Sequence, residues 1–293
     1  MTKSTLNHPT KEANHQYDCE HIHVRVYEDS NLACQKIGDE IIDQINQKSA
    51  NKPFVLGLAT GSTPIKIYQH LIQAYQERKV SFANVHSFNL DEYFPMDPKS
   101  IHSYVEFMHK NFFDHIDILE ENIHIPDGTI APEKIDHYCK SYEKAIQSLG
   151  GIDIQLLGIG RTGHIGFNEP GSAINSKTRR VWLDPITRKD AASSFFGEQF
   201  VPKQAITMGV DTIMKAKKVY LMAWGEGKSN IISRAVEGTI SEQVPATFLQ
   251  QHVDCEFVLD KASASELSRE KTPWLVGTCH WDSEQIKKAV IWL

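Results

Sequence analysis

Residues 158–170 read Gly-Ile-Gly-Arg-Thr-Gly-His-Ile-Gly-Phe-Asn-Glu-Pro and carry the clearest chemical signal in the chain. His164 and Glu169 stand close together in this stretch. A histidine beside a carboxylate is the usual apparatus for moving protons near neutral pH. The glycines let a ligand approach the backbone closely. The loop therefore predicts proton-transfer chemistry on a small ligand.

The same loop contains a glycine pattern that dinucleotide-binding proteins also use. Gly158, Gly160 and Gly163 match G-x-G-x-x-G, and the apolar run Ile152–Leu157 precedes them. A dinucleotide site also needs a helix that opens at the third glycine, so that the helix N-terminus meets the pyrophosphate. The chain soon reaches Pro170, which leaves no room for that helix. We therefore expect no nicotinamide or flavin cofactor.

A second segment rich in glycine and hydroxyl groups follows the apolar run Phe54–Leu58 and ends at Pro64. Ser62 or Thr63 can cap the helix that begins next, and exposed N–H groups with the helix dipole favour an anion there. No Gly-Lys pair follows, so the segment is not a P-loop. A plain strand-to-helix turn is the alternative. The predicted phosphate-binding residues are Thr60, Gly61, Ser62 and Thr63.

Charged side chains follow two further apolar runs. Asp91 and Glu92 come after Val85–Asn89, and they would point to opposite sides of a continuing strand. At most one of them therefore faces a ligand. Lys228 follows Val219–Trp224 at the start of a helical pattern, where its charge opposes the helix dipole unless an anion binds nearby. The alternative for the first segment is a turn with a solvated aspartate, and the alternative for Lys228 is an ordinary surface lysine.

Short apolar runs alternate with amphipathic stretches along the chain. The predicted strands are Ile22–Tyr27, Phe54–Leu58, Val85–Asn89, Ile152–Leu157, Arg180–Leu183, Val219–Trp224 and Phe257–Asp260. The predicted helices are Asn31–Gln47, Ile65–Glu77, Glu133–Ser148, Ser229–Val236 and Ser283–Trp292. This alternation predicts an α/β fold of three layers, a doubly wound, mostly parallel, Rossmann-like sheet with helices on both faces. Ligands of such sheets bind beyond the carboxyl ends of the strands, where the polar segments fall.

Composition and charge exclude several classes of protein. The formal net charge of -6 offers no basic face for nucleic acid, and no window is long and apolar enough to span a membrane. The five cysteines are widely spaced, as in a reducing cytoplasm, and no histidine spacing fits a known metal-ligand set. We expect a cytoplasmic protein without a metal site, with a flexible extension at residues 1–20 and a single α/β domain at residues 21–293.

Several segments resemble the glucosamine-6-phosphate deaminase family. The matching stretches, in the family's order, are Leu56–Pro64, Phe88–Tyr93, Gly163–Pro170, Val201–Val210, Val236–Gly238 and Leu249–His252. The resemblance implies conversion of glucosamine 6-phosphate and water to fructose 6-phosphate and ammonia. It implies that the Thr60–Thr63 loop and Lys228 hold the phosphate. It also implies that His164 opens the pyranose ring with support from Glu169, and that Asp91 moves a proton from C2 to C1.

The chain departs from the family pattern at positions that bear on catalysis. Thr162 replaces an aspartate of the ring-opening relay, and a hydroxyl cannot stabilise an imidazolium by charge. We therefore expect ring opening to be impaired but not abolished. Ser193 and Ser194 stand where the family commonly has an arginine that contacts phosphate. Arg188 or Lys203 is a candidate for that contact.

The resemblance leaves regulation, assembly and domain organisation open. Only Arg179 matches the basic residues that bind an allosteric amino-sugar phosphate in some members, so we do not expect that regulation. Family members are monomers, trimers or hexamers, which leaves a homo-oligomer open. A divergent group with a similar glycine-rich loop continues into a deacetylase-like domain, so a fused C-terminal domain is a further expectation. Two alternatives to a deaminase are another amino-sugar-phosphate isomerase and a non-catalytic sugar-phosphate sensor.

Overall fold

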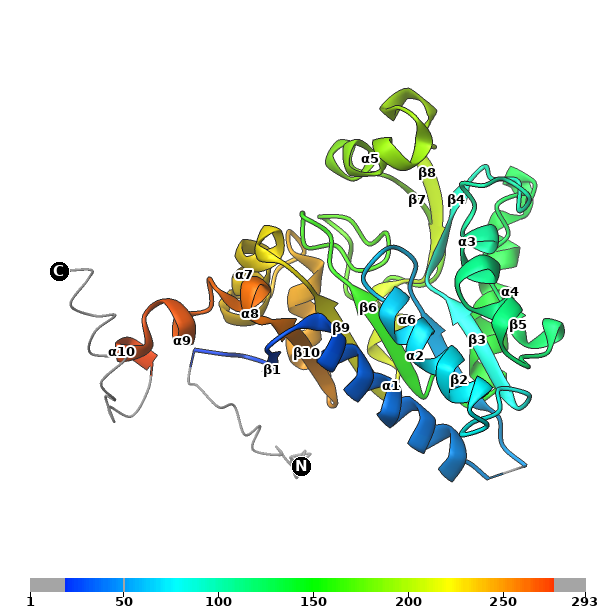
Figure 1. Cartoon of the computed structure of the whole chain (residues 1–293). Coiled ribbons are helices and arrows are strands. Elements are labelled where there is room, and N and C mark those ends of the chain that lie inside the picture. The colour runs from blue at the N-terminus through cyan, green and yellow to red at the C-terminus, as the bar shows by residue number, and fades with distance from the viewer. Residues whose placement is uncertain (1–18, 50, 277–293) are drawn as a thin grey trace, which may run out of the picture.

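The computed structural model describes residues 19–49 and 51–276, and its centre is a parallel sheet of seven strands (Figure 1). In spatial order the strands are β1 (His23–Tyr27), β10 (Cys255–Asp260), β9 (Lys218–Ala223), β6 (Ile154–Gly158), β2 (Phe54–Leu58), β3 (Val85–Asn89) and β5 (Ile123–His124). Every neighbouring pair in this sheet is parallel. The order places β2 and β6 side by side near the middle, so the loops that follow them share one edge.

Side chains of successive strand residues enter two separate cores. Phe54, Leu56 and Leu58 of β2 belong to one buried cluster, whereas Val55 belongs to the other. The period of two along a strand requires this division when both faces of the sheet are covered. The continuous apolar runs of the sequence are therefore strands buried on both sides, and the predicted three-layer α/β class is confirmed.

Helices cover both faces of this sheet. The α-helices are α1 (Ser30–Gln47), α2 (Ile65–Gln76), α3 (Tyr104–Asn111), α4 (Ile135–Ser148), α5 (Pro185–Ala191), α6 (Val210–Met214), α7 (Ser229–Glu237), α8 (Lys261–Ala264), α9 (Ser268–Lys271) and α10 (Pro273–Val276). Helices α1, α2 and α3 pack into the first cluster, and α4, α6, α7 and α8 pack into the second. Among the described residues, no helix is long and apolar enough to cross a membrane.

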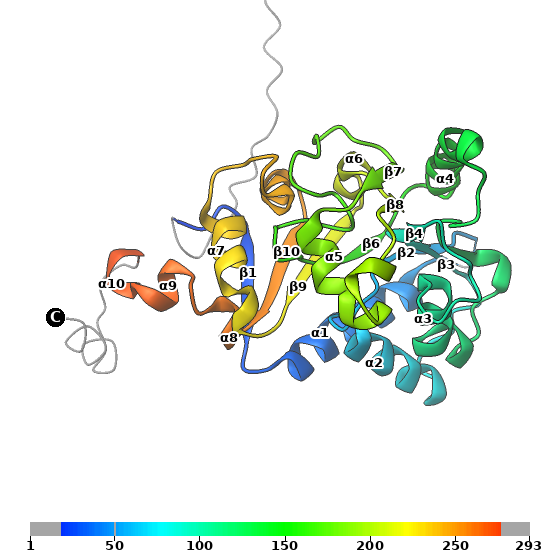
Figure 2. The ribbon, with the colours of Figure 1, turned by 90° about the horizontal axis from the view of Figure 1, so that it is seen from above.

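A second, antiparallel sheet rises from the carboxyl edge of the main sheet. Its strands are β4 (Asp91–Phe94), β8 (Gln204–Thr207) and β7 (Arg179–Trp182), with β8 in the centre. Figure 1 shows β7, β8 and α5 above the main sheet, and Figure 2 looks down on them. Only the β7 segment had been predicted as a strand. The sequence does not predict β4, because two of its four residues are Asp and Glu, which are poor strand formers.

Two predictions about the ends of the chain concern residues that are mostly not described. Residues 1–18 of the predicted extension and the predicted helix Ser283–Trp292 lie outside the described residues. Glu20, at the end of that extension, is buried, and the Nε of Arg269 lies 3.3 Å from its carboxylate. The assignment of residues 21–293 to one domain stays a prediction.

Gly209 allows the segment before β7 to pack closely against the start of α6. A Cβ atom on Gly209 would lie 2.1 Å from the backbone oxygen of Ser176. That oxygen accepts a hydrogen bond from the N–H of Asp211, and the Ser176 hydroxyl accepts one from Val210. Any larger residue therefore pushes apart two segments of backbone that satisfy the first turn of α6.

We predict that Gly209→Ala lowers the free energy of unfolding by about 1–3 kcal/mol, the usual cost of overpacking. Urea denaturation followed by circular dichroism measures the change. Gly227→Ala is the matched control, because a Cβ atom there meets nothing within 4 Å. Equal stability of the two variants would show that the contact at Gly209 is easily relieved.

Candidate active site

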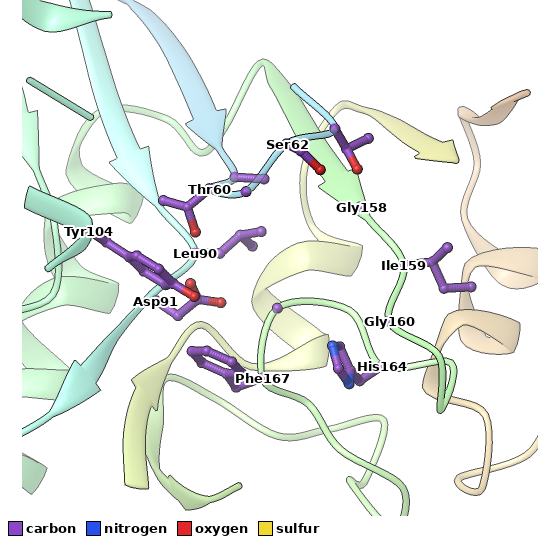
Figure 3. Close-up of a pocket in the computed structure, with 14 residues that line it drawn as sticks. Thr60, Ser62, Leu90, Asp91, Tyr104, Gly158, Ile159, Gly160, His164 and Phe167 are labelled. Atoms are coloured by element: carbon purple, nitrogen blue, oxygen red, sulfur yellow. The ribbon is translucent and has the colours of Figure 1, made fainter. Parts of the chain in front are cut away.

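A polar pocket of about 240 Å³ opens at the carboxyl ends of β2, β3 and β6. It is lined by Ala59, Thr60, Gly61, Ser62, Thr63, Leu90, Asp91, Tyr104, Gly158, Ile159, Gly160, His164, Gly166 and Phe167. Figure 3 shows Asp91 and His164 on opposite sides of this pocket, with Thr60 and Ser62 along a third side. Three segments that the sequence singled out separately therefore converge on one space.

The loop between β2 and α2 presents hydroxyl groups and free backbone donors to the pocket. Gly61 has φ +94°, a conformation that favours glycine. The predicted capping by Ser62 or Thr63 is wrong, because Pro64 is the N-cap residue and no described side chain caps α2. The ring of Pro64 fixes φ at the entry to the helix, and no described side chain caps the first N–H groups of α2. The hydroxyls of Ser62 and Thr63 are therefore not used as caps and remain available to a ligand.

Asp91 is the first residue of β4, and its carboxyl group is buried at the pocket wall with 6% of the residue exposed. It accepts no hydrogen bond from any described residue. Burial, with a smaller contribution from the neighbouring charge of Glu92, raises the pKa of Asp91 to about 8. A carboxyl group in this state is a strong base once it ionises.

Glu92 points away from the pocket and serves the fold. Its carboxylate accepts hydrogen bonds from the N–H groups of Tyr93, Tyr104 and Val105, at 2.8, 2.7 and 3.3 Å. Burial raises the pKa of Glu92 to about 7 against the opposing effect of these donors. Successive side chains of a strand point to opposite sides, and accordingly only one of the two adjacent carboxylates faces the pocket. The other fixes the start of α3 beside β4.

The imidazole of His164 is held through its Nδ1 atom. Nδ1 lies 3.0 Å from Oε2 of Glu169, 3.0 Å from Oγ1 of Thr162 and 3.3 Å from Oγ1 of Thr187. The opposite edge of the ring lies against Gly160, where a Cβ atom would be 2.1 Å from Nε2. Only glycine at position 160 leaves room for the ring in this orientation. His164 and Gly160 both line the pocket, so Nε2 is the nitrogen nearest to a ligand.

Glu169 is buried and ionised beside this histidine. Burial raises its pKa, but the hydrogen bond and charge of His164 and a hydrogen bond from Thr187 outweigh burial and hold the pKa below its ordinary value. The N–H of Asp184 adds a third donor at 3.3 Å. The carboxylate therefore stabilises a positive charge on the imidazole.

The rest of the Phe-Asn-Glu-Pro segment anchors the loop to the small sheet. The amide of Asn168, which is fully buried, donates to the backbone oxygens of Ile165 and Met208 at 2.9 Å each. The N–H of Phe167 donates to the hydroxyl of Thr207 at the end of β8. Asp91 pairs with Thr207 in the neighbouring strand. The same strand end therefore fixes the loop of His164 relative to Asp91.

Lys228 lies just behind the pocket wall. Its Nζ donates to the backbone oxygen of Ile159 at 2.7 Å, and Ile159 lines the pocket. It stands at the N-cap of α7, as the sequence predicted. Burial lowers its pKa, and the charge of Asp190 opposes that effect. An ammonium group has three N–H donors, and one hydrogen bond to a described residue leaves the others for an anion.

The other candidate binding residues from the sequence do not line the pocket. Arg188 donates to the backbone oxygen of Glu198, and neither Arg188 nor Lys203 lines the pocket. Arg179 donates to Asn168 and Ser172, so it supports the loop. Within residues 19–49 and 51–276, no three His, Cys, Asp or Glu side chains come together as a metal-ligand set.

Two residues that contact the pocket or His164, Tyr104 and Thr187, were not predicted. Tyr104 lines the pocket and is hydrogen bonded to Thr60, and its ring lies 6.2 Å from that of Phe167. Thr187 reaches His164 from helix α5. An aromatic residue at a helix start and a threonine inside a helix carry no local signal of a site. Their proximity depends on how the small sheet folds over the main sheet.

The chain is similar to known proteins over most of its length. The model of the family described as glucosamine-6-phosphate isomerases/6-phosphogluconolactonase matches residues 28–257. A glucosamine-6-phosphate deaminase of Oceanobacillus iheyensis is 47% identical over 239 residues, 82% of this chain and 92% of that protein. A glucosamine-6-phosphate deaminase-like protein of Bacteroides thetaiotaomicron is 44% identical over 275 residues, 94% of this chain. The chain spans only 42% of the length of the Bacteroides protein.

Solved structures agree with this relationship. A monomeric glucosamine-6-phosphate deaminase has a TM-score of 0.80 and 39% identity, covering 84% of this chain and 100% of its own. A 6-phosphogluconolactonase of Leishmania guyanensis, with a TM-score of 0.64 and 19% identity, shares the fold. The family match and these relatives show that the chain belongs to the glucosamine-6-phosphate isomerase/6-phosphogluconolactonase family.

Proposed function

We propose that this protein converts glucosamine 6-phosphate and water to fructose 6-phosphate and ammonia. The observation that carries the proposal is the pairing of a buried base, Asp91, with a carboxylate-supported histidine, His164, in one pocket. The hydroxyl-rich loop after β2 lies in the same pocket. Relatives described as glucosamine-6-phosphate deaminases are 44–50% identical to the chain. A hexosamine phosphate matches the polar lining.

In this proposal the phosphate binds at the loop Thr60–Thr63, with Lys228 behind it. The hydroxyls of the loop and the uncapped start of α2 supply neutral donors. Lys228 supplies the cation, and a phosphate dianion relieves the unfavourable burial of its ammonium group. This contact fixes the C6 end of the sugar and places the reacting carbons between Asp91 and His164.

His164 would open the pyranose ring. Its Nε2 accepts the proton of the C1 hydroxyl and returns a proton to the ring oxygen, which yields the open-chain aldehyde. The imidazolium formed between these two transfers is stabilised by the carboxylate of Glu169 at 3.0 Å. Thr162 adds a neutral hydrogen-bonding group at the same nitrogen.

Asp91 would then move a proton between carbons. Its carboxylate removes the proton from C2 of the open-chain sugar and delivers it to C1, while one proton of the substrate ammonium group passes to O1. The aldehyde thereby becomes an alcohol, and the ammonium group becomes a protonated imine at C2. Water adds to that imine carbon, and ammonia leaves. Burial makes the base strong, and the ammonium group of the substrate favours its ionised form on binding.

A sugar-phosphate sensor without catalysis is the second candidate. The observation that favours it is Thr162, which stands at Nδ1 of His164 where the family pattern has a carboxylate. An isomerase acting on another amino-sugar phosphate is a variant of the enzyme hypothesis. A cytoplasmic location, a homo-oligomer and a fused C-terminal domain stay predictions.

We predict equal amounts of ammonia and fructose 6-phosphate when the purified protein is incubated with glucosamine 6-phosphate. Asp91→Asn should lower kcat at least about a hundredfold, the usual contribution of a general base. Two coupled enzymatic assays quantify the products, and calorimetry measures binding of the sugar phosphate. Asp43→Asn, on the exposed side of α1, is the matched control. Tight binding without turnover would contradict the deaminase and support the sensor.

The raised pKa of Asp91 predicts a pH-dependent stability. The folded protein retains a proton on Asp91 up to about pH 8, whereas the pKa of an unperturbed aspartate is 3.8. Between these values unfolding releases that proton, so the contribution of Asp91 to stability falls as pH rises. Asp91→Asn should therefore gain stability relative to the wild type from about pH 4 to pH 8, with a constant difference above.

Urea denaturation at a series of pH values measures this trend, and Asp43→Asn again serves as the control. A difference between wild type and Asp91→Asn that does not change with pH would show that Asp91 is ionised in the folded protein. In activity assays, the same pKa predicts that kcat/KM falls as pH drops below about 8, because only the ionised carboxylate accepts a proton.

We predict that Thr162→Asp raises kcat. A charge-assisted hydrogen bond exceeds a neutral one by about 1 kcal/mol, which corresponds to roughly a fivefold change in rate. Steady-state kinetics at saturating glucosamine 6-phosphate measure the effect. Thr162→Val, which removes the hydroxyl and adds no charge, should lower kcat. An aspartate variant no faster than the wild type would show that charge at this position does not limit the reaction.

A further inference from the structure

Helix α5 (Pro185–Ala191) lies near strands β7 and β8 of the small sheet (Figure 2). One of its faces contacts the loop of His164. Asp184, Thr187 and Asp190 are spaced by three residues and therefore lie on the same side of the helix. The N–H of Asp184 donates to Glu169, and the carboxylate of Asp190 forms a two-pronged ion pair with Arg161. Both partners belong to the His164 loop.

Thr187 is the central contact on this face. Its Oγ1 lies 3.3 Å from Nδ1 of His164, and its hydroxyl is also hydrogen bonded to Glu169. The residue is 7% exposed, so water does not readily replace its hydroxyl. Because α5 lies outside the glycine-rich loop, this contact joins the relay to a separate element of the fold.

We propose that Thr187 is a positioning residue for His164, which fixes the imidazole with Nε2 toward the pocket. This inference rests on the proposed function, since ring opening needs Nε2 as the acceptor. The ion pair between Arg161 and Asp190 holds α5 against the loop, so that the hydroxyl stays within reach of the ring.

The physical basis is the placement of oxygens around the ring. Three side-chain oxygens, from Thr162, Glu169 and Thr187, surround Nδ1. A neutral imidazole carries one N–H, and oxygens around one nitrogen favour the tautomer in which that nitrogen is protonated. Nε2 then keeps its lone pair for the C1 hydroxyl of the sugar. Removing Thr187's hydroxyl leaves Glu169 with one donor fewer and allows the ring to turn.

A second buried threonine provides a control for a purely structural role. The hydroxyl of Thr212 donates to the buried carboxylate of Glu143 at 2.5 Å, and Thr212 is 5% exposed. Neither Thr212 nor Glu143 lines the active-site pocket. A threonine-to-valine change there removes a hydroxyl from a buried carboxylate without touching the relay.

The experiment compares Thr187→Val, Thr187→Ser and Thr212→Val in two measurements. The first is long-range nitrogen–proton NMR of the free protein, which reports the tautomer of each histidine. The chain has 14 histidines, so the signal of His164 is assigned by its loss in His164→Gln. The second is the pH profile of kcat and KM with glucosamine 6-phosphate.

Thr187→Val should lower the share of the Nδ1–H tautomer at His164 and reduce kcat by roughly two- to tenfold, with KM nearly unchanged. Thr187→Ser should keep both properties, and Thr212→Val should lower stability alone. An unchanged tautomer in Thr187→Val overturns the inference, whether or not the protein deaminates the sugar. A changed tautomer in a protein without turnover supports the positioning role and overturns the proposed function alone.

Discussion

The structure depends on holding the carboxyl group of Asp91 in a buried position without a hydrogen-bond partner among the described residues. Such a group costs free energy, because burial disfavours its charged form and nothing near it compensates. The surrounding elements hold the strand that carries it in place. Glu92 binds three backbone N–H groups on the other side of the strand, and β4 is paired along its length with β8. The strand cannot turn the carboxyl group outward without breaking these bonds.

This constraint explains why the chain builds a second, small sheet. The main sheet alone brings together the loops after β2 and β6, which supply hydroxyls and the histidine. The small sheet and the helix beside it add Asp91 on β4, the anchor for Phe167 on β8 and the hydroxyl of Thr187 on α5. The pocket is therefore a junction of two sheets, and its chemistry needs both. Rigid packing of the main sheet on both faces supports that junction.

The sequence predicted the main sheet because most of its longer strands are short, largely apolar runs between helical patterns. It predicted Asp91, His164 and the loop Thr60–Thr63 because these residues directly follow such runs, and the structure brings them to one pocket. It missed β4, because two carboxylates at its start resemble a turn, and it missed Thr187 and Tyr104. Their contacts cross long stretches of chain, and no periodic pattern encodes the packing of one sheet on another.

The contacts around His164 show how the fold limits the effect of Thr162, which replaces an aspartate of the family pattern. With Thr162 at Nδ1, Glu169 is the single carboxylate hydrogen bonded to the ring among the described residues. One carboxylate lies 3.0 Å from the ring, and hydroxyls from two elements help to define its orientation. Orientation and charge are separable contributions to proton transfer. In the proposed reaction, α5 would preserve the orientation of the ring and Glu169 would supply the remaining charge, so we expect ring opening to be slowed and not abolished.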